Sequence, residues 1–508
     1  MADPGPNDAA PESDVGDTRV FWILFAVAAA VAVAPLCLAS YLPMIDLPQH
    51  TAQLAIGKGW DNPSNHYQET YQFNWFVNHI IPRLLVMLFG TFLSLQAAMK
   101  VVVGLALVGL PASVVWLLHR LRSDLYWSLP TFVVGFGFSF CWGFFDFVFA
   151  VPLGVLLIVA GYDYATQPSR RRALALAGLA LLCFLSHILV LGAAAAVAAS
   201  LVVAGRLTLR QRLAGLGALA SVAALALAFS LAARRFAVPS SHHIPLATAY
   251  GLQRFHELLT FQVGLVDPDG HRAALGALLL ALPFVMGARP SRQWFRWVPV
   301  AVALLMFFWM PHDMFSVAFL HGRYAVFVLP TLLIALEPAR SARRALRWLA
   351  FAVVIACLGL NGVDLLSFDA EARGLDPVLG QMRAHRRVMY LATDPSSDFV
   401  PYPAYVHFGS YYQVTRGGPV DFSFADFFGT RYRYRPEAEP HLPGGVEWAP
   451  GRFRWARHDG YRYDYLLVRG PVLPIWFVGM PAGVSYRLVV SRGPWHLLER
   501  ADTRSLLP

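Results

Sequence analysis

Charged residues are scarce in this sequence, at 14% of 508 residues, whereas apolar residues make up 57% and the mean hydropathy is +0.49. Soluble globular proteins carry about 25% charged and about 45–50% apolar residues. The shortage of charge therefore excludes a soluble enzyme and an intrinsically disordered chain, and the composition also excludes a collagen-like fibre. It predicts a polytopic membrane protein.

Cysteine is scarce as well, with four residues that all lie within or at the ends of apolar runs: Cys37, Cys141, Cys183 and Cys357. None belongs to a Cys-x-x-Cys pair, so the sequence predicts neither a disulfide scaffold nor a structural zinc site. The four are interpreted as small buried hydrophobes. Nucleophile-elbow, P-loop, Gly-x-Gly-x-x-Gly and His-Glu-x-x-His motifs are also missing, so no short motif assigns a reaction class by itself.

Apolar runs, in contrast, are abundant, and many approach the roughly 20 residues that a transmembrane helix needs. We predict eleven spans, at residues 20–42, 98–118, 125–142, 147–163, 172–187, 189–205, 212–232, 272–287, 296–311, 323–337 and 345–362. The Pro- and Asp-rich residues 1–19 are predicted to be a disordered cytoplasmic tail. They do not form a signal peptide, because the tail is acidic and the apolar run that follows is too long.

Basic residues gather in five clusters between these spans: Arg120 and Arg122; Arg170, Arg171 and Arg172; Arg206, Arg210 and Arg212; Arg289, Arg292 and Arg296; and Arg340, Arg343, Arg344 and Arg347. If all five face the cytoplasm, each segment between them crosses the membrane an even number of times, as the paired spans do. Residues 363–508 then lie outside the cytoplasmic (inner) membrane. Topology thus accounts for most of the net charge of +10, and no nucleic-acid partner is expected.

One apolar run, residues 80–98, would break this count if it crossed the membrane. We interpret it as a juxtamembrane or re-entrant helix. Under the resulting topology the polar side chains collect on the outer side, where all sixteen histidines except His119 fall, together with Asp146 and Asp313 at two hairpin tips. Because ionisable residues at membrane depth are costly and indicate function, the sequence predicts a site at the outer membrane surface.

The first outer loop, residues 43–97, opens with the motif Asp46-Leu-Pro-Gln-His50 ahead of a predicted short helix. One interpretation is structural, since Asp46 precedes a proline in the first helical turn and is placed to cap the helix. The functional interpretation is a carboxylate held at the bilayer surface, with His50 one turn further along the same helix. Such a carboxylate can act as a general base toward a hydroxyl or an amine.

Two further outer loops carry candidate residues. The loop at residues 236–271 contains the adjacent His242 and His243, which could bind a metal ion only with further ligands, and an amphipathic stretch that is predicted to lie in the membrane interface. The hairpin tip at residues 311–324 contains Asp313, His321 and Arg323. Arg323 at the start of an apolar helix needs an anion, which is either Asp313 or a lipid phosphate.

Beyond residue 363 the composition shifts to Tyr, Arg, Pro and Gly, and the apolar runs shorten to strand length. We predict a helix at residues 376–385 and strands at residues 387–392, 463–468 and 484–491. The sequence thus predicts a C-terminal extracytoplasmic domain, residues 363–508, of the α/β or α+β class.

This layout resembles the GT-C superfamily of membrane glycosyltransferases, which includes the protein O-mannosyltransferases and the aminoarabinose transferases of lipid A. The likeness begins with an acidic residue in the first outer loop and continues with a juxtamembrane helix that ends in Leu88-Phe89-Gly90, a span that ends in basic residues (100–122), Asp146 at the next outer tip, and Leu185-Ser186-His187. Two positions depart from that pattern. Leu47 follows Asp46 where a second acidic residue is common, and His187 replaces a lysine.

The resemblance implies a GT-C-like domain at residues 20–362 and a polyprenyl-phosphate sugar as donor. It implies that Asp46 is the general base and that His50 orients it or assists a cation. The donor phosphate would bind to Arg323, His187 and Arg83. Further site candidates are Asp146, His321, Asp313, His242 and His243. The acceptor, whether a glycan, a lipid or a protein, stays open, as does a divalent metal ion, and no other cofactor is expected.

Two other classes fit the same composition. A polysaccharide polymerase or ligase is chemically adjacent to a transferase. A non-enzymatic transporter or flippase of lipid-linked sugars would carry polar residues near the bilayer midplane and two symmetric halves, whereas this sequence has its polar residues at span ends and shows no two-fold repeat. An inactive scaffold is the remaining alternative.

Overall fold

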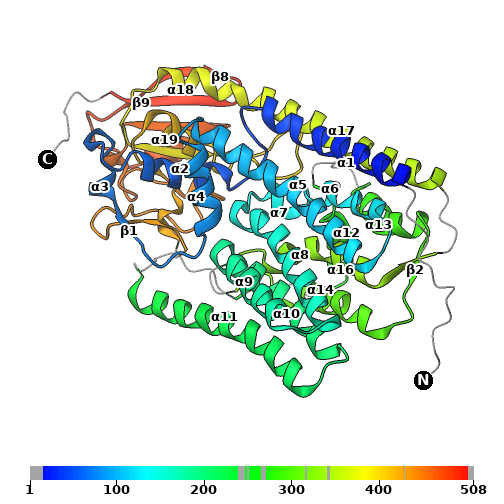
Figure 1. The fold of residues 1–508 in the computed structure, drawn as a ribbon. Helices are drawn as coiled ribbons and strands as arrows, with labels where there is room; N and C mark the ends of the chain where they lie inside the picture. The colour runs from blue at the N-terminus through cyan, green and yellow to red at the C-terminus, as the bar shows by residue number, and fades with distance from the viewer. Residues whose placement is uncertain are drawn as a thin grey trace, which may run out of the picture.

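The computed structural model describes residues 15–237, 246–248, 251–264, 271–314, 317–339, 344–427 and 429–501. The protein is mostly helical, with a small sheet near the C-terminus. Figure 1 shows that this sheet and the first loop gather at one end of the helical region. The predicted fold class is therefore confirmed at the level of a helical protein with a small C-terminal sheet.

Within the described part of the chain, five helices are long and apolar enough to cross a membrane: α1 (Val15–Leu38), α5 (Leu95–Leu121), α8 (Phe145–Thr166), α11 (Leu209–Phe236) and α17 (Arg344–Ala372). Other predicted spans fall on apolar helical segments of 10–17 residues. At about 1.5 Å per residue these are shorter than the roughly 30 Å hydrocarbon core. The predicted count of eleven spans is therefore not confirmed, although the chain is compatible with a membrane protein.

The remaining α-helices are shorter: α2 (Leu47–Lys58), α3 (Tyr67–Thr70), α4 (Ile80–Phe89), α6 (Pro130–Val134), α7 (Phe138–Cys141), α9 (Arg170–Ser186), α10 (Ile188–Ala204), α12 (Gln253–Thr260), α13 (Arg272–Val285), α14 (Val298–Trp309), α15 (Leu320–Arg323), α16 (Val328–Ile334), α18 (Asp376–Gln381) and α19 (Ser410–Arg416). Two small antiparallel pairs join β1 (Tyr71–Phe73) to β6 (Tyr432–Tyr434) and β2 (Ala288–Pro290) to β3 (Leu336–Pro338).

Helix α4 explains the apolar run at residues 80–98. It ends at Phe89, with Gly90 as its C-cap, and α5 begins at Leu95, with Ser94 as its N-cap. A helix of 10 residues reaches only about 15 Å, roughly half of the hydrocarbon core. The interpretation of this run as a juxtamembrane or re-entrant segment agrees with the break.

The start of α1 differs from the predicted tail at residues 1–19. The helix begins at Val15, and Asp17 in its first turn forms an ion pair of 2.5 Å with Arg347 on α17. This contact holds the first turn against the neighbouring helix, so the last part of the predicted tail is helical. Residues 1–14 lie outside the described part of the chain. Three of the four cysteines are buried as expected, but Cys37 is exposed at the end of α1.

The C-terminal region, residues 373–501, contains a five-stranded sheet in the order β5 (Val420–Asp421), β4 (Val388–Ala392), β7 (Tyr465–Arg469), β9 (Trp495–Arg500) and β8 (Tyr486–Arg492). Strands β5, β4 and β7 are parallel, whereas β9 runs antiparallel to both of its neighbours. The three predicted strands correspond to β4, β7 and β8. The predicted helix at residues 376–385 is α18, which ends at Gln381. Helix α17 continues past residue 362, and the domain boundary at 363 stays a prediction.

The first loop and the C-terminal region are joined by contacts between distant parts of the chain. Strand β1 in the loop pairs with β6, and α2 packs against α19. Two buried glutamines on α2 reinforce this junction. The Gln49 amide donates to the carbonyl of Phe422 (3.0 Å), and the Gln53 amide donates to the carbonyl of Tyr432 (3.2 Å). These contacts hold the first loop, which follows the first predicted span, against the C-terminal region.

Candidate functional site

Asp46 lies in the turn between α1 and α2, held by the turn that leads into α8. Its backbone N–H donates to the carbonyl of Trp142 (3.1 Å). At Gly143, where φ is +75°, a Cβ atom would lie 2.6 Å from the backbone nitrogen of Asp46, so only glycine permits this close approach. The Asp46 side chain makes no hydrogen bond that caps α2. Asp46 thus occupies the N-cap position of α2, but its carboxylate caps no backbone N–H of the helix and is available for another role.

The carboxylate of Asp46 faces an imidazole from the C-terminal region. His407 Nε2 lies 3.4 Å from Asp46 Oδ1, and the two side chains are 5% and 18% exposed, respectively. The His407 ring stacks on Phe422 at 5.7 Å between centroids. Sequence reasoning placed His407 among fifteen histidines on the outer side but did not connect it with Asp46. No local signal could do so, because the contact depends on how the C-terminal region packs on the first loop.

Arg323 was predicted to bind the donor phosphate, and its guanidinium packs against an aromatic ring. Its guanidinium carbon lies 3.4 Å from the centre of the Phe144 ring, and Nη2 donates to the carbonyl of Ala318 (3.1 Å). Nε is buried and has no hydrogen-bond partner among the described residues. The Phe144 ring belongs to the same turn as Trp142, whose carbonyl accepts the backbone N–H of Asp46, so Arg323 and Asp46 contact one turn. A buried guanidinium with a spare N–H suits an anionic oxygen.

Asp313 is not the partner of Arg323. Its carboxylate accepts hydrogen bonds from the backbone N–H of Phe319 (3.0 Å) and contacts His312 Nδ1 (2.7 Å). The interpretation of Arg323 and Asp313 as an internal ion pair is therefore wrong. Arg323 keeps its capacity for a phosphate.

A second carboxylate, Asp146, forms the centre of a closed ion-pair cluster. Its Oδ2 lies 3.0 Å from Arg83 Nη2 on α4 and 3.3 Å from His79 Nδ1. The His79 ring stacks on the His187 ring at 4.7 Å between centroids and an interplanar angle of 14°. His187 Nδ1 in turn accepts the backbone N–H of Leu189 at the start of α10. The structure thus brings Asp146, Arg83 and His187 together, and it adds His79, which sequence reasoning did not single out.

His50, on α2, packs its ring against Phe145 and Phe424. Burial lowers the pKa of its imidazole from 6.5 to about 4, against the opposing influence of the charges on Asp146 and Asp46. The ring is therefore neutral at pH 7. Its Nδ1 is buried without a hydrogen-bond partner, and its ring packs edge-on against Phe424. His50 belongs to the site, but the imidazole that contacts Asp46 is that of His407.

The two carboxylates differ in their access to solvent. Asp146 is 3% exposed, and its Oδ1 is buried without a partner. Asp46 is 18% exposed, and neither of its oxygens is among the buried atoms that lack a partner. Two carboxylates in different environments are commonly assigned different roles. Here Asp46 is accessible to a substrate, whereas Asp146 holds α4 against α8.

Several residues of this site carry a buried polar atom without a partner, although native proteins leave few such atoms. The described residues with such atoms near Asp46 and Asp146 include His50 (Nδ1), Asp146 (Oδ1), Arg323 (Nε) and His407 (Nδ1). Each unpaired buried group costs about 1–3 kcal/mol unless something else pairs with it. We call these residues, with Asp46, His79, Arg83 and His187, the Asp46 cluster.

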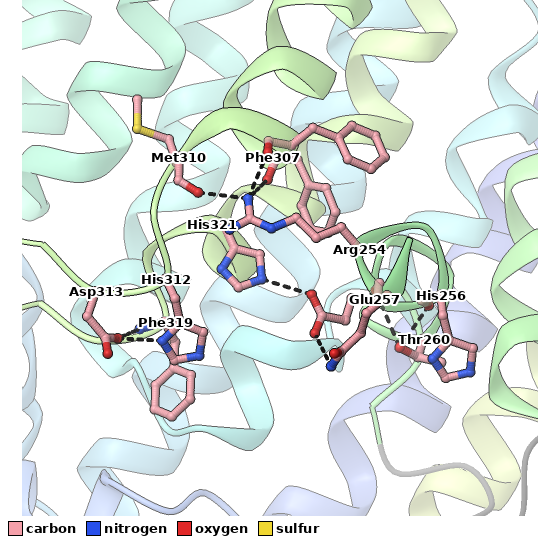
Figure 2. A network of polar contacts seen from close by, with 12 residues as sticks. Arg254, His256, Glu257, Thr260, Phe307, Met310, His312, Asp313, Phe319 and His321 are labelled. Carbon is pink, nitrogen blue, oxygen red and sulfur yellow. Dashed lines mark hydrogen bonds and ion pairs between the residues drawn. The ribbon is translucent and has the colours of Figure 1, made fainter. Parts of the chain in front are cut away.

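Two predicted candidates, His321 and Asp313, lie in a separate network (Figure 2). His321 Nε2 lies 3.0 Å from Glu257 Oε2, which joins α15 to α12. The buried guanidinium of Arg254 on α12 donates to the carbonyls of Phe307 and Met310 at the end of α14, at 2.9 and 2.7 Å. This network fixes α12 and α14 around the short helix that carries Arg323. The structure does not bring His321 or Asp313 into contact with Asp46.

The metal prediction finds no support in the described part of the chain, where no group of three or more His, Cys, Asp or Glu side chains is arranged to hold a metal ion. His242 and His243 lie outside the described residues. The described helical part of the predicted amphipathic stretch is α12, residues 253–260.

In comparisons with known proteins, no protein-family model matches the chain and no curated protein matches its sequence. The geometry of the Asp46 cluster and the motifs of the sequence are thus the basis for assigning a function.

Proposed function

We propose that the protein is a membrane glycosyltransferase of the GT-C type, which transfers a sugar from a polyprenyl-phosphate donor to an acceptor at the outer face of the cytoplasmic membrane. One observation carries the proposal. Asp46, an accessible carboxylate without a capping hydrogen bond, and Arg323, a guanidinium with a spare N–H, both contact the turn at residues 142–144: the Asp46 N–H donates to the carbonyl of Trp142 (3.1 Å), and the Arg323 guanidinium lies 3.4 Å from the centre of the Phe144 ring. A base next to an anion site is what transfer from a lipid phosphate requires.

The reaction follows from these two groups. A hydroxyl or amine of the acceptor attacks the anomeric carbon of the sugar from the side opposite the phosphate. The new bond to the acceptor forms as the bond from the anomeric carbon to the phosphate oxygen breaks, which inverts the configuration. Asp46 takes the proton from the acceptor, and Arg323 stabilises the negative charge that develops on the departing polyprenyl phosphate.

The other members of the cluster have supporting roles in this proposal. Arg83 and His187 were predicted to bind the phosphate, but Arg83 is engaged by Asp146 and His187 accepts a helix N–H. In this proposal Arg83 adds positive electrostatic potential at the site, and both side chains hold the helices that line it. Arg83 and His79 compensate the charge of Asp146, which leaves Asp46 as the accessible carboxylate of the site.

The proposal is tested by mass spectrometry of the lipids that co-purify with the wild-type protein and with Asp46→Asn. Asp61→Asn is the matched control, because Asp61 is an exposed carboxylate in the same loop. We expect a polyprenyl-phosphate sugar to be retained by Asp46→Asn, and to be turned over by the wild type and by Asp61→Asn.

Any of three results would contradict the proposal. Bulk phospholipid alone with all three proteins would argue against a lipid-linked donor. Turnover by Asp46→Asn at near wild-type level would exclude Asp46 as the base. Retention of the lipid-linked sugar without turnover by the wild type, in the presence of lipid, glycan and peptide acceptors, would favour a transporter.

A further inference from the structure

We infer that His407 is a positioning residue for Asp46, so that the C-terminal region completes a site whose other residues come from the helical region and the first loop. This inference rests on the proposed function, and it deepens it by assigning a residue that no sequence motif marks. It begins with the contact itself. His407 Nε2 lies 3.4 Å from Asp46 Oδ1.

The direction of this contact follows from the chemistry of the two groups. An ionised carboxylate only accepts hydrogen bonds, so Nε2 must carry the proton that is directed at Asp46. The separation exceeds the roughly 2.7–2.9 Å of a charge-assisted hydrogen bond. Contacts of this kind are often long in the free enzyme and shorten when substrate is bound. The inferred role of His407 is therefore to position Oδ1 of Asp46 when the acceptor binds.

The position of His407 is fixed by the packing around it. The ring stacks on Phe422 at an interplanar angle of 22° and meets Phe424 edge-on at 5.4 Å between centroids. Gln49 fixes both phenylalanines. Its amide donates to the carbonyl of Phe422 (3.0 Å), and its oxygen accepts the backbone N–H of Phe424 (2.9 Å). Gln49 lies on α2, three residues after Asp46. The same short helix therefore positions the Asp46 carboxylate and the two phenylalanines that hold the His407 ring.

His407 could instead be a ring that only fills space between phenylalanines, and its polar atoms argue against this. The side chain is 5% exposed, and its Nδ1 is buried without a hydrogen-bond partner in the described part of the chain. A phenylalanine in its place would keep the packing and avoid the cost of about 1–3 kcal/mol for an unpaired buried nitrogen. The imidazole is thus explained by its contact with Asp46.

Two variants separate these roles. His407→Phe keeps a ring against Phe422 but removes the N–H, and His407→Gln keeps an N–H donor without the ring. His441→Phe is the matched control, because His441 contacts Asp459 (2.9 Å) in the same region of the chain but is 83% exposed. All variants are made in the full chain and purified in detergent.

The first measurement is the thermal unfolding midpoint of Asp46→Asn, of His407→Phe and of the double variant, and it does not depend on activity. If the side chains interact, the shifts in midpoint are not additive, and we expect a discrepancy of about 2 °C or more. Additive shifts would overturn the inference whatever the activity of the protein.

The second measurement is turnover of the lipid-linked sugar that co-purifies with the wild type. We expect His407→Phe to lower kcat at least about tenfold with little change in the KM for the donor, whereas His407→Gln restores most of the rate and His441→Phe has no effect. Full turnover by His407→Phe would overturn the positioning role. Coupled midpoints with no turnover by the wild type would overturn the proposed function, and the role of His407 with it, while leaving the contact established.

Discussion

The ion pair between Arg83 and Asp146 gives the sharpest prediction about stability, because it concerns a charge that the fold has removed from water. Asp146 is 3% exposed and Arg83 is 12% exposed, and their nitrogen and oxygen atoms are 3.0 Å apart. Oδ1 of Asp146 already lacks a hydrogen-bond partner. The substitution Arg83→Met leaves a buried carboxylate whose one remaining ion-pair contact among the described residues is His79.

The expected cost follows from the burial. Removing one partner of a buried ion pair costs about 3–5 kcal/mol, since the remaining charge stays desolvated. The pair between Arg120 and Asp163 is a matched control at a similar separation of 3.3 Å, but Arg120 is 41% exposed. For Arg120→Met we expect only about 0–1 kcal/mol, the range for exposed pairs.

The assay is the free energy of unfolding in mixed detergent micelles for Arg83→Met, Arg120→Met and the double variant Arg83→Met/Asp146→Asn. The double variant removes the uncompensated charge, so it should recover more than half of the stability that Arg83→Met loses. A loss below about 1 kcal/mol for Arg83→Met would refute the reasoning. The same holds if the double variant is as unstable as the single variant.

Two further predictions concern the same end of the molecule. Burial lowers the pKa of His50 to about 4 from its ordinary 6.5, so between these values the unfolded chain binds a proton that the folded chain does not. The stability should therefore fall as the pH is lowered from about 6.5 toward 4, and His50→Phe should flatten this dependence in thermal unfolding. An unchanged slope would show that His50 is accessible to solvent. Gln53 exchanges two hydrogen bonds with the backbone of Tyr432. Gln53→Met should cost about 1–3 kcal/mol and increase proteolysis of the C-terminal region; unchanged proteolysis would separate α2 from the stability of that region.

Within the Asp46 cluster, the success of sequence reasoning depended on how local each signal was. Asp46 and Asp146 were identified from the sequence because each lies next to an apolar run. An ionised carboxylate there has a high free-energy cost and therefore indicates a function. Asp46 was assigned two roles, and only the structure showed that its side chain makes no capping hydrogen bond, because capping depends on where a side chain points. Likewise, an Arg323–Asp313 pair was plausible by proximity in sequence, but Asp313 is satisfied by Phe319 and His312.

The sequence by itself determined the broad class of the protein, because hydropathy and strand-length apolar runs are local properties that survive in any tertiary arrangement. It therefore predicted the helical region and three strands of the C-terminal sheet. It could not determine the number of complete spans, because that depends on where each helix ends. Only the tertiary structure decided that His79 joins Asp146 and that His407 reaches Asp46. The His407 contact forms because α2 packs on α19 and β1 pairs with β6, and such pairing between distant segments leaves no periodic trace in the chain.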